Sequence, residues 1–328
     1  MATLAEVSLG TVSHYINHPD RVSPEKSKRI QQAIDQLGFV RNNAAWQLRL
    51  GRSGTIAYIA PDVSNPFFAT IAEGVEQRAA THGLSVFISN SNRSRVREDA
   101  YLDLFESQRV QGMLVASHES VEDRLTLIRQ RGIPSVLVGQ RASSELQPSV
   151  SIDDVAGGFA AVRHLLDLGR RRIAFVGGPL GIRQVADRYE GATAAVRQVV
   201  DATLEVINVT NRTIADGREV ARALAARPPE FRPDAIFAVN DLTALGLLQS
   251  LAGDSGIRVP EDIALIGYDD IEFAGSSLIP LSSIRAPHEG FGFAAVDLLV
   301  NEMSAEPDDT LRQVVFQPEL VVRASTRG

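Results

Sequence analysis

The sequence contains no cysteine, which excludes disulfide bonds, thiolate zinc sites and cysteine nucleophiles. It also contains no apolar run of about 18 residues, the length at which a transmembrane helix is suspected. The first ten residues lack the basic start and apolar centre of a secretory signal, so we expect a cytoplasmic protein without a membrane partner. With 44% hydrophobic and 22% charged residues, the composition is that of a globular protein.

The common catalytic motifs are also missing. There is no phosphate-binding G-x-x-x-x-G-K-[ST], no G-x-S-x-G and no H-E-x-x-H, and the six histidines have no metal-ligand spacing. The segment 290–295 resembles a dinucleotide-binding G-x-G-x-x-A pattern, but no strand precedes it. We therefore predict that the protein is not an enzyme and has neither a cofactor nor a metal site.

Charge is unevenly distributed along the chain. The net charge is −7, yet residues 1–53 hold seven basic and four acidic side chains, so this segment carries +3 and the remainder −10. A chain of 328 residues has room for about two domains and a small appendage. The pattern indicates a small basic head that meets an anion, and a large acidic core with another task.

The head has the pattern of short packed helices. Val12, Tyr15 and Ile16 have helical spacing, and the first helix should end near Asn17. Ser23 and Pro24 are typical of the start of a second helix, which Gly38 should end. A short third helix is expected at 42–48.

The segments 7–17 (VSLGTVSHYIN), 22–25 (VSPE) and 37–39 (LGF) resemble the helix-turn-helix of lactose-repressor (LacI/GalR) type transcription regulators. The resemblance implies a helix in the DNA major groove and a hinge-helix leucine in the minor groove. It also implies the DNA-contacting residues, which are Leu9, Gly10, Thr11, Ser13, His14, Asn17 and Leu48.

The head departs from this family at its start, because Met1–Glu6 is shorter than the family's first helix. We therefore expect a helix-turn-helix head with a truncated first helix at 1–40 and a hinge helix or linker at 41–53. Three interpretations remain open. The native start lies upstream, or the protein is a cytoplasmic small-molecule sensor that no longer binds DNA, or the head is a plain three-helix packing module.

From Gly54 onward, short apolar runs alternate with helical segments, which predicts α/β units around parallel sheets. Strands are expected at 55–60, 84–88, 112–116, 135–138, 172–177, 204–207, 235–239 and 263–267. Helices are expected at 69–83, 158–169, 186–200, 216–227 and 291–303. Four strands followed by four strands predict two doubly wound subdomains, at about 54–152 plus 284–312 and 153–283 plus 313–328.

Polar loops follow several of the predicted strands, where open α/β sheets bind ligands. Their carboxylates, amides, guanidinium and aromatic rings suit a polyol. Residues 54–328 resemble the effector-binding core of the same family, which is of the periplasmic-binding-protein type. The resemblance implies effector contacts by Asn65, Phe67, Phe68, Arg188, Asn240 and Asp269.

Four of these residues also have a purely structural alternative. Asp269, like its neighbour Asp270, suits a loop cap, Arg188 a helix-end salt bridge, and the two phenylalanines a hydrophobic core. Asp153 and Asp154 match a family position near a subdomain crossover, but a helix N-cap explains Asp154 equally well. Residues 211–213 replace an aromatic that the family often has, which argues against stacking on a simple hexose.

Together these features predict a sequence-specific DNA-binding transcriptional regulator, a repressor, controlled by a small polar effector such as a sugar or related metabolite. The family implies a homodimer or tetramer, associated with the nucleoid, on a pseudo-palindromic operator. A solute-binding protein is the rival interpretation, but it predicts a signal peptide. A small-molecule enzyme on a doubly wound fold is a further alternative, and it would need turnover of the bound ligand.

Overall fold

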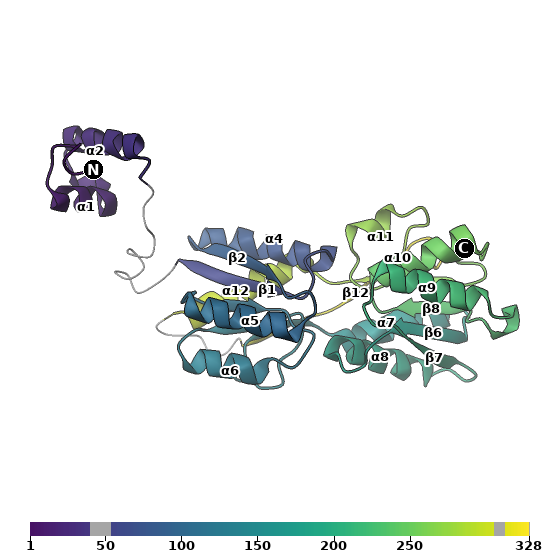
Figure 1. Cartoon of the computed structure of the whole chain (residues 1–328). Coiled ribbons are helices and arrows are strands. Elements are labelled where there is room, and N and C mark those ends of the chain that lie inside the picture. The colour runs from purple at the N-terminus through teal and green to yellow at the C-terminus, as the bar shows by residue number, and fades with distance from the viewer. Residues whose placement is uncertain (40–53, 305–311, 328) are drawn as a thin grey trace. The chain divides into compact units, whose positions relative to one another are not determined.

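The computed structural model describes residues 1–39, 54–304 and 312–327. The chain divides into two compact units, Met1–Ser53 and Gly54–Gly328, which we call the head and the core (Figure 1). The predicted hinge at 41–53, including the helix at 42–48 and Leu48, lies outside the described residues.

The head consists of α1 (Leu9–Asn17), the 3-10 helix η1 (Pro19–Arg21) and α2 (Pro24–Leu37). The Ser8 hydroxyl caps α1 by accepting a hydrogen bond from the Thr11 amide at 3.1 Å. Only turns precede α1 in residues 1–7. A small apolar cluster holds the helices together; its buried members are Ala5, Val12, Ile30 and Ala33.

The described residues of the core form three sheets. The first is parallel and has the order β11-β5-β4-β3-β1-β2. Its strands are β1 (Thr55–Ala60), β2 (Ser85–Asn90), β3 (Met113–Val115), β4 (Ser135–Val138), β5 (Ser149–Ile152) and β11 (Gln313–Phe316). The second is parallel, in the order β7-β6-β8-β9. Its strands are β6 (Arg172–Gly177), β7 (Thr203–Asn208), β8 (Ala235–Ala238) and β9 (Ala264–Ile266). A two-stranded antiparallel sheet joins β10 (Ser283–Arg285) to β12 (Glu319–Val321).

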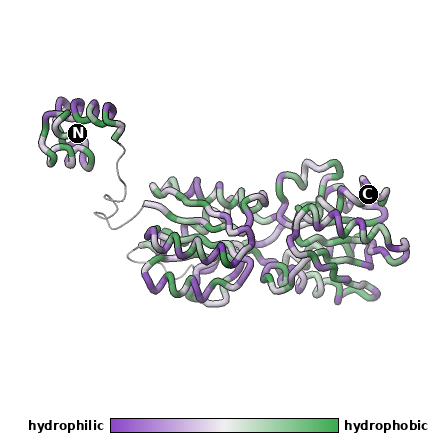
Figure 2. Tube along the Cα trace, in the orientation of Figure 1, coloured by the Kyte–Doolittle hydropathy of each residue, from purple (hydrophilic) through white to green (hydrophobic). Residues whose placement is uncertain are grey.

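Helices cover these sheets, and Figure 2 shows hydrophobic stretches alternating with polar ones along the chain. The longer helices are α4 (Pro66–Thr81), α5 (Arg95–Ser107), α6 (Glu122–Gln130), α7 (Asp154–Asp167), α8 (Arg183–Val196), α9 (Ile214–Ala225), α10 (Asp241–Leu248) and α12 (His288–Glu302). The five-residue α11 (Glu272–Ser276), the 3-10 turn η2 (Pro229–Phe231) and the π-helical η3 (Gln249–Asp254) complete the second half.

Strand β1 shows why both faces of the first sheet need helices. Alternate residues of a strand point to opposite faces. Ile56 and Tyr58 join the cluster that includes α4 and α12, whereas Ala57 and Ile59 join the cluster that includes α5 and α6. All four side chains are buried. Strands β6, β8 and β9 of the second sheet are also almost entirely buried, and the two helix-covered parallel sheets confirm the predicted α/β fold with two doubly wound subdomains.

The predicted subdomain boundary at 313 is wrong. Strand β11 does not belong to the second subdomain, because it pairs in parallel with β5 at the edge of the first sheet. The chain then crosses again through β12, which pairs with β10. A four-residue edge strand carries no sequence signal that says which sheet it joins, so only the long-range pairing decides the boundary.

Helices α9 and α10 approach each other through two glycines. A Cβ atom on Gly217 would lie 2.1 Å from the Thr243 carbonyl oxygen, and one on Gly246 would lie 2.1 Å from the Ile214 carbonyl oxygen. We therefore expect Gly217→Ala to lower the free energy of unfolding by about 1–3 kcal/mol, because the packed backbones must separate. Urea denaturation followed by circular dichroism measures this loss.

Gly181→Ala is the matched control, because a Cβ atom there meets no atom within 4 Å. It should leave the free energy of unfolding nearly unchanged. Equal stability of the two variants would show that α9 and α10 can move apart without cost.

Candidate functional site

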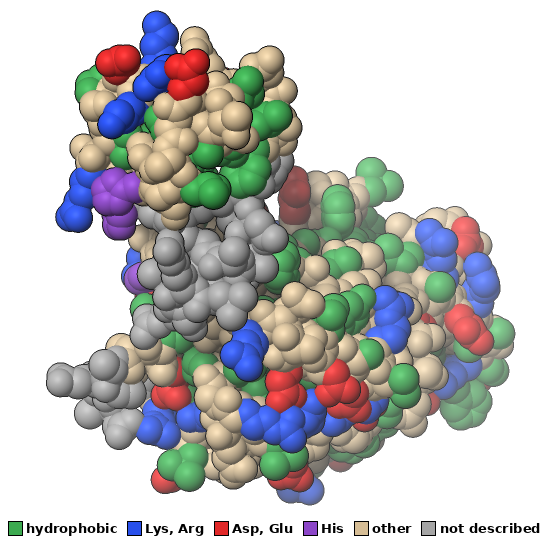
Figure 3. Space-filling view, turned by 60° about the vertical axis from the view of Figure 1, so that its left-hand side comes forward, with side chains coloured by type: hydrophobic (Ala, Val, Ile, Leu, Met, Phe, Trp, Pro, Cys, Tyr) green, Lys and Arg blue, Asp and Glu red, His purple; other side chains and the backbone are tan. Residues whose placement is uncertain are grey.

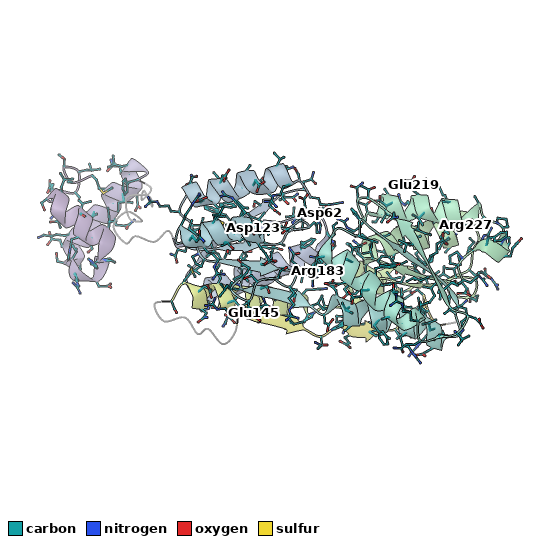
Figure 4. The ribbon with its side chains drawn as sticks, turned by 90° about the horizontal axis from the view of Figure 1, so that it is seen from below. Asp62, Asp123, Glu145, Arg183, Glu219 and Arg227 are labelled. Atoms are coloured by element: carbon teal, nitrogen blue, oxygen red, sulfur yellow. The ribbon has the colours of Figure 1, made fainter. Side chains whose placement is uncertain are left out.

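A pocket between the two subdomains of the core collects all six predicted effector-binding residues. Asn65, Phe67, Phe68, Arg188, Asn240 and Asp269 line it together. Most of its polar residues come from segments that follow strands, at the edge where parallel strands end. In Figure 4, Asp62 of the first subdomain and Arg183 at the start of α8 lie at the boundary between the subdomains, away from Glu219 and Arg227.

Arg188 is the centre of a buried charge network in this pocket. Its Nε donates to the Asp154 carboxylate at 2.8 Å, and its Nη1 donates to the Val239 carbonyl at 2.6 Å. The Nη2 atom lies 3.7 Å from the Asp269 carboxylate. The guanidinium also stacks 3.6 Å from the centre of the Tyr268 ring. These contacts fix the orientation of the Arg188 side chain, which extends from the middle of α8. Arg188 therefore forms a salt bridge, as the structural alternative predicted, and it also lines the pocket.

Asp269 has an unusual backbone and a perturbed carboxyl. Its φ of 103° lies in the left-handed region, and its amide donates to the Ile284 carbonyl at 2.8 Å. Burial raises the pKa of Asp269 to about 7, although the charge of Arg188 opposes this shift. Backbone strain and a carboxyl that titrates near neutrality are features that cluster at ligand sites. The neighbouring Asp270 carboxylate pairs with Arg285 and Arg323 and does not cap the loop, since the Ile271 amide donates to Asp241 at 2.9 Å.

The two asparagines have structural duties as well as pocket positions. The Asn65 side chain caps α4 by accepting from the Phe67 amide at 3.1 Å. The Asn240 side chain caps α10 through the Thr243 amide at 3.0 Å and donates to the Arg212 carbonyl at 3.1 Å. Both are almost fully buried. Asn240 therefore has little free hydrogen-bonding capacity for a ligand.

The phenylalanines are both core and pocket residues. Phe67 and Phe68 are 8% and 9% exposed and contact each other edge to face at 5.0 Å. Phe67 also packs against Phe291, and Phe68 packs against His118.

The structure also decides which aspartate caps α7. The N-cap is Asp153 and not Asp154, since the Asp153 side chain accepts a hydrogen bond from the Ala156 amide. This leaves Asp154 free to pair with Arg188.

Several polar or aromatic residues that were not among the predicted effector contacts also line the pocket, among them Asp62, Arg93, His118, Arg212 and Tyr268. Each follows a strand end closely, after β1, β2, β3, β7 and β9 respectively. The loops that hold Asp62 and Tyr268 were already recognised as polar loops after strands, and the same rule would have found Arg93, His118 and Arg212 had it been applied to every strand. The charges of Arg93 and Arg212 are the main additions.

The predicted DNA contacts lie on α1 of the head. Leu9, Gly10 and His14 are exposed, with Leu9 at 81%, whereas Thr11 and Ser13 are partly buried. The side chain of Asn17 and all of Leu48 lie outside the described residues. An exposed leucine on the first turn of a helix adds nothing to the head's core, so its side chain is free to meet another surface.

Among the described residues there is neither a group of three side chains that could hold a metal ion nor a helix long and apolar enough to cross a membrane. Figure 3 shows basic and acidic side chains interspersed on the visible face of the core.

Comparison with known proteins agrees with this geometry. Residues 1–42 match the family "Bacterial regulatory proteins, lacI family", and residues 162–326 match a "Periplasmic binding protein-like domain". The transcriptional repressor CytR of Escherichia coli (strain K12) is 31% identical over 332 residues, which cover 100% of this chain and 95% of CytR.

Two solved structures extend the comparison. The lac repressor dimer bound to operator and the anti-inducer ONPF is 25% identical, with a TM-score of 0.84 over 100% of this chain and 98% of that chain. The regulator CelR in complex with cellobiose is 31% identical, with a TM-score of 0.71 over 99% of this chain and 98% of that chain. The chain belongs to the lacI family of bacterial regulatory proteins and is a helix-turn-helix transcriptional regulator with a periplasmic-binding-protein-like core.

Proposed function

We propose that this regulator represses transcription by binding a pseudo-palindromic operator as a homodimer, and that a small polar effector in the core pocket changes its operator affinity. The observation that carries the proposal is the pocket itself, in which residues of both subdomains meet around Arg188 and Asp269. A ligand that bridges these residues stabilises one relative arrangement of the subdomains over another.

The connections between the subdomains support such a motion. The chain passes between them after β5, at β10 and at β12, so three short segments form the connection. Because these segments are few and short, they can act as a hinge that absorbs changes in backbone angle. A typical coupling between ligand and DNA binding is about 1–3 kcal/mol.

A sugar or related polyol fits the pocket best. The carboxylate of Asp269 and the guanidinium of Arg188 can accept from and donate to adjacent hydroxyls, and Phe67 and Phe68 offer apolar faces. CelR, which resembles this chain along almost its whole length, was solved with cellobiose. That relative supports a carbohydrate effector here.

The decisive experiment selects DNA from a random library with the full chain at two salt concentrations, and then repeats binding with a panel of sugars. We expect a pseudo-palindrome to be enriched and one sugar class to change its affinity by about 5–150-fold. Failure to enrich any sequence, together with a sugar that binds, would replace the proposal by a sensor that does not bind DNA.

Leu9 gives a test of sequence readout. Because its side chain is 81% exposed, Leu9→Ala should leave the thermal stability of the head unchanged. An apolar side chain in the major groove reads the thymine methyl group, so the variant should lose about 1–3 kcal/mol at one base-pair position of the selected operator. Electrophoretic mobility shifts with single-base operator variants measure this loss. A uniform loss across all variants would show that Leu9 does not read sequence.

A further inference from the structure

Arg212 is a buried cation in the pocket without an acidic partner. Its side chain follows β7, and the residue is only 9% exposed. Within residues 54–304 and 312–327, no carboxylate oxygen lies within 4.0 Å of its guanidinium. Its Nη1 donates to the Gly178 carbonyl at 2.9 Å and the Thr210 carbonyl at 3.3 Å, and its Nη2 lies 3.4 Å from His118 Nδ1. These partners satisfy hydrogen bonds, but they do not neutralise the charge.

The surroundings of Arg212 increase this excess of positive charge. The Asp62 carboxylate is already paired with Arg93 at 2.5 Å and accepts two further hydrogen bonds from Ser64. Arg93 in turn donates to the Asn211 carbonyl at 2.5 Å, which brings a second guanidinium next to the loop that carries Arg212. Arg188, the third guanidinium in the pocket, is engaged by Asp154 and Asp269. Three arginines thus line one pocket, and two of them have acidic partners.

The titration behaviour agrees with that geometry. Burial, together with the charges of Arg93 and Arg188, lowers the pKa of Arg212 to about 10, although the more distant charges of Asp216 and Asp62 oppose this shift. Burial also lowers the pKa of His118 to about 3, so this imidazole is neutral at physiological pH and adds no cation of its own. A neutral His118 is able to accept from Arg212 or to donate to a bound oxygen, according to its tautomer.

Such an arrangement raises the free energy of the folded protein when no anion is bound. A buried charge without a counter-charge is strongly unfavourable, whereas a guanidinium matched to a carboxylate or phosphate forms short, charge-assisted hydrogen bonds. The missing counter-charge therefore points to the ligand. Asp269 and Arg188 remain to bind hydroxyl groups from another side of the same pocket.

We infer that the effector carries an anionic group, a phosphate or a carboxylate, which binds the Arg212 guanidinium beside His118 while its hydroxyls face Arg188 and Asp269. This inference rests on the proposed function, because it concerns the effector of the same pocket. It narrows the effector from polyols in general to sugar phosphates and sugar acids.

The test uses isothermal titration calorimetry on the full chain with matched ligands that differ in charge. Glucose, glucose 6-phosphate and gluconate form one set, and ribose and ribose 5-phosphate form another. Thermal shift with inorganic phosphate, against sodium chloride of equal ionic strength, probes the anion site alone. We expect phosphate to raise the melting temperature and at least one anionic sugar to bind more than tenfold tighter than its neutral counterpart. Preference for the phosphate or for the carboxylate member identifies the source of the anion.

Arg212→Gln should abolish both effects, and Arg212→Lys should retain part of them. Arg218→Gln is the control, because Arg218 lies on α9 outside the pocket and its exposed side chain donates to the Gln249 side-chain oxygen at 2.9 and 2.7 Å. Without ligand, Arg212→Gln should melt at the same temperature as the native chain or higher, since a costly buried charge is removed. A simple brace of the loop would instead predict a lower melting temperature.

Several results would overturn the inference: no phosphate-dependent shift in the native chain, equal affinity for neutral and anionic sugars, or an Arg212→Gln variant with unchanged anion affinity. A neutral sugar that alters operator binding would contradict the anionic effector and leave the proposed function standing. Anion binding by a chain that selects no operator would support the anionic ligand and contradict the proposed function.

Discussion

Replacing Arg188 with methionine is expected to destabilise the core by about 3–5 kcal/mol, because the change leaves buried carboxylates without their cation. Asp154 and Asp269 both face this guanidinium, and both are less than a tenth exposed. Methionine keeps much of the volume over the Tyr268 ring, so lost packing contributes little. Urea denaturation of the full chain, followed by circular dichroism, measures the change.

Arg183→Met on the same helix is the control. Its side chain is 52% exposed and pairs with Asp187 one turn later, an arrangement worth less than about 1 kcal/mol. The Arg188 variant should also lose the response to any sugar that stabilises the native chain. Comparable stability of the two variants would mean that the Arg188 network is relaxed by water and is not a buried ion pair.

The pH dependence of stability should reveal the carboxyl of Asp269. Its pKa is raised from 3.8 to about 7, so between these values the folded state keeps a proton that the unfolded state has released. The free energy of unfolding therefore falls as pH rises, with a limiting slope of about 1.4 kcal/mol per pH unit from this group. The stabilisation is complete below the unfolded pKa and is lost as pH rises through the folded pKa.

Asp269→Asn removes this titration, so the stability of the native chain relative to the variant should decline steadily from pH 5 to pH 7 and then level off. Denaturation curves at pH 5, 6, 7 and 8 test the expectation. Asp270→Asn is the neighbouring control. Arg285 and Arg323 hold the pKa of Asp270 below its usual value, so its charge does not change over this range. A constant difference between the native chain and Asp269→Asn would show that this carboxyl is ionised throughout.

Continuous apolar runs allowed some strands to be predicted to the residue. Strands β1, β4 and β6 have the expected bounds, because parallel strands buried on both faces require uninterrupted apolar side chains. Strand β5 was missed, since Ser149 and Ser151 interrupt its run even though both are buried. Local hydrophobicity does not predict a strand whose serines are buried by the surrounding fold.

In the pocket, too, local sequence predicts some of the important residues and only the fold identifies the others. The resemblance and the strand-end rule identified Asp269 and Arg188, and the structure brings both into one pocket. Arg212 was considered only as part of a segment that lacks an aromatic ring. Its significance depends on burial and on the absence of a nearby carboxylate among the described residues, and neither property can be derived from local sequence.

By itself, the sequence determined the family, the helix-turn-helix head, the α/β class of the core and the residues at which a ligand site should be sought. These properties follow from motifs, capping residues and hydrophobic periodicity, which are local. The tertiary structure decided which sheet takes β11, which aspartate caps α7, and which arginines in the pocket have acidic partners. Those outcomes depend on distances between residues far apart in the chain, and long-range packing alone sets such distances.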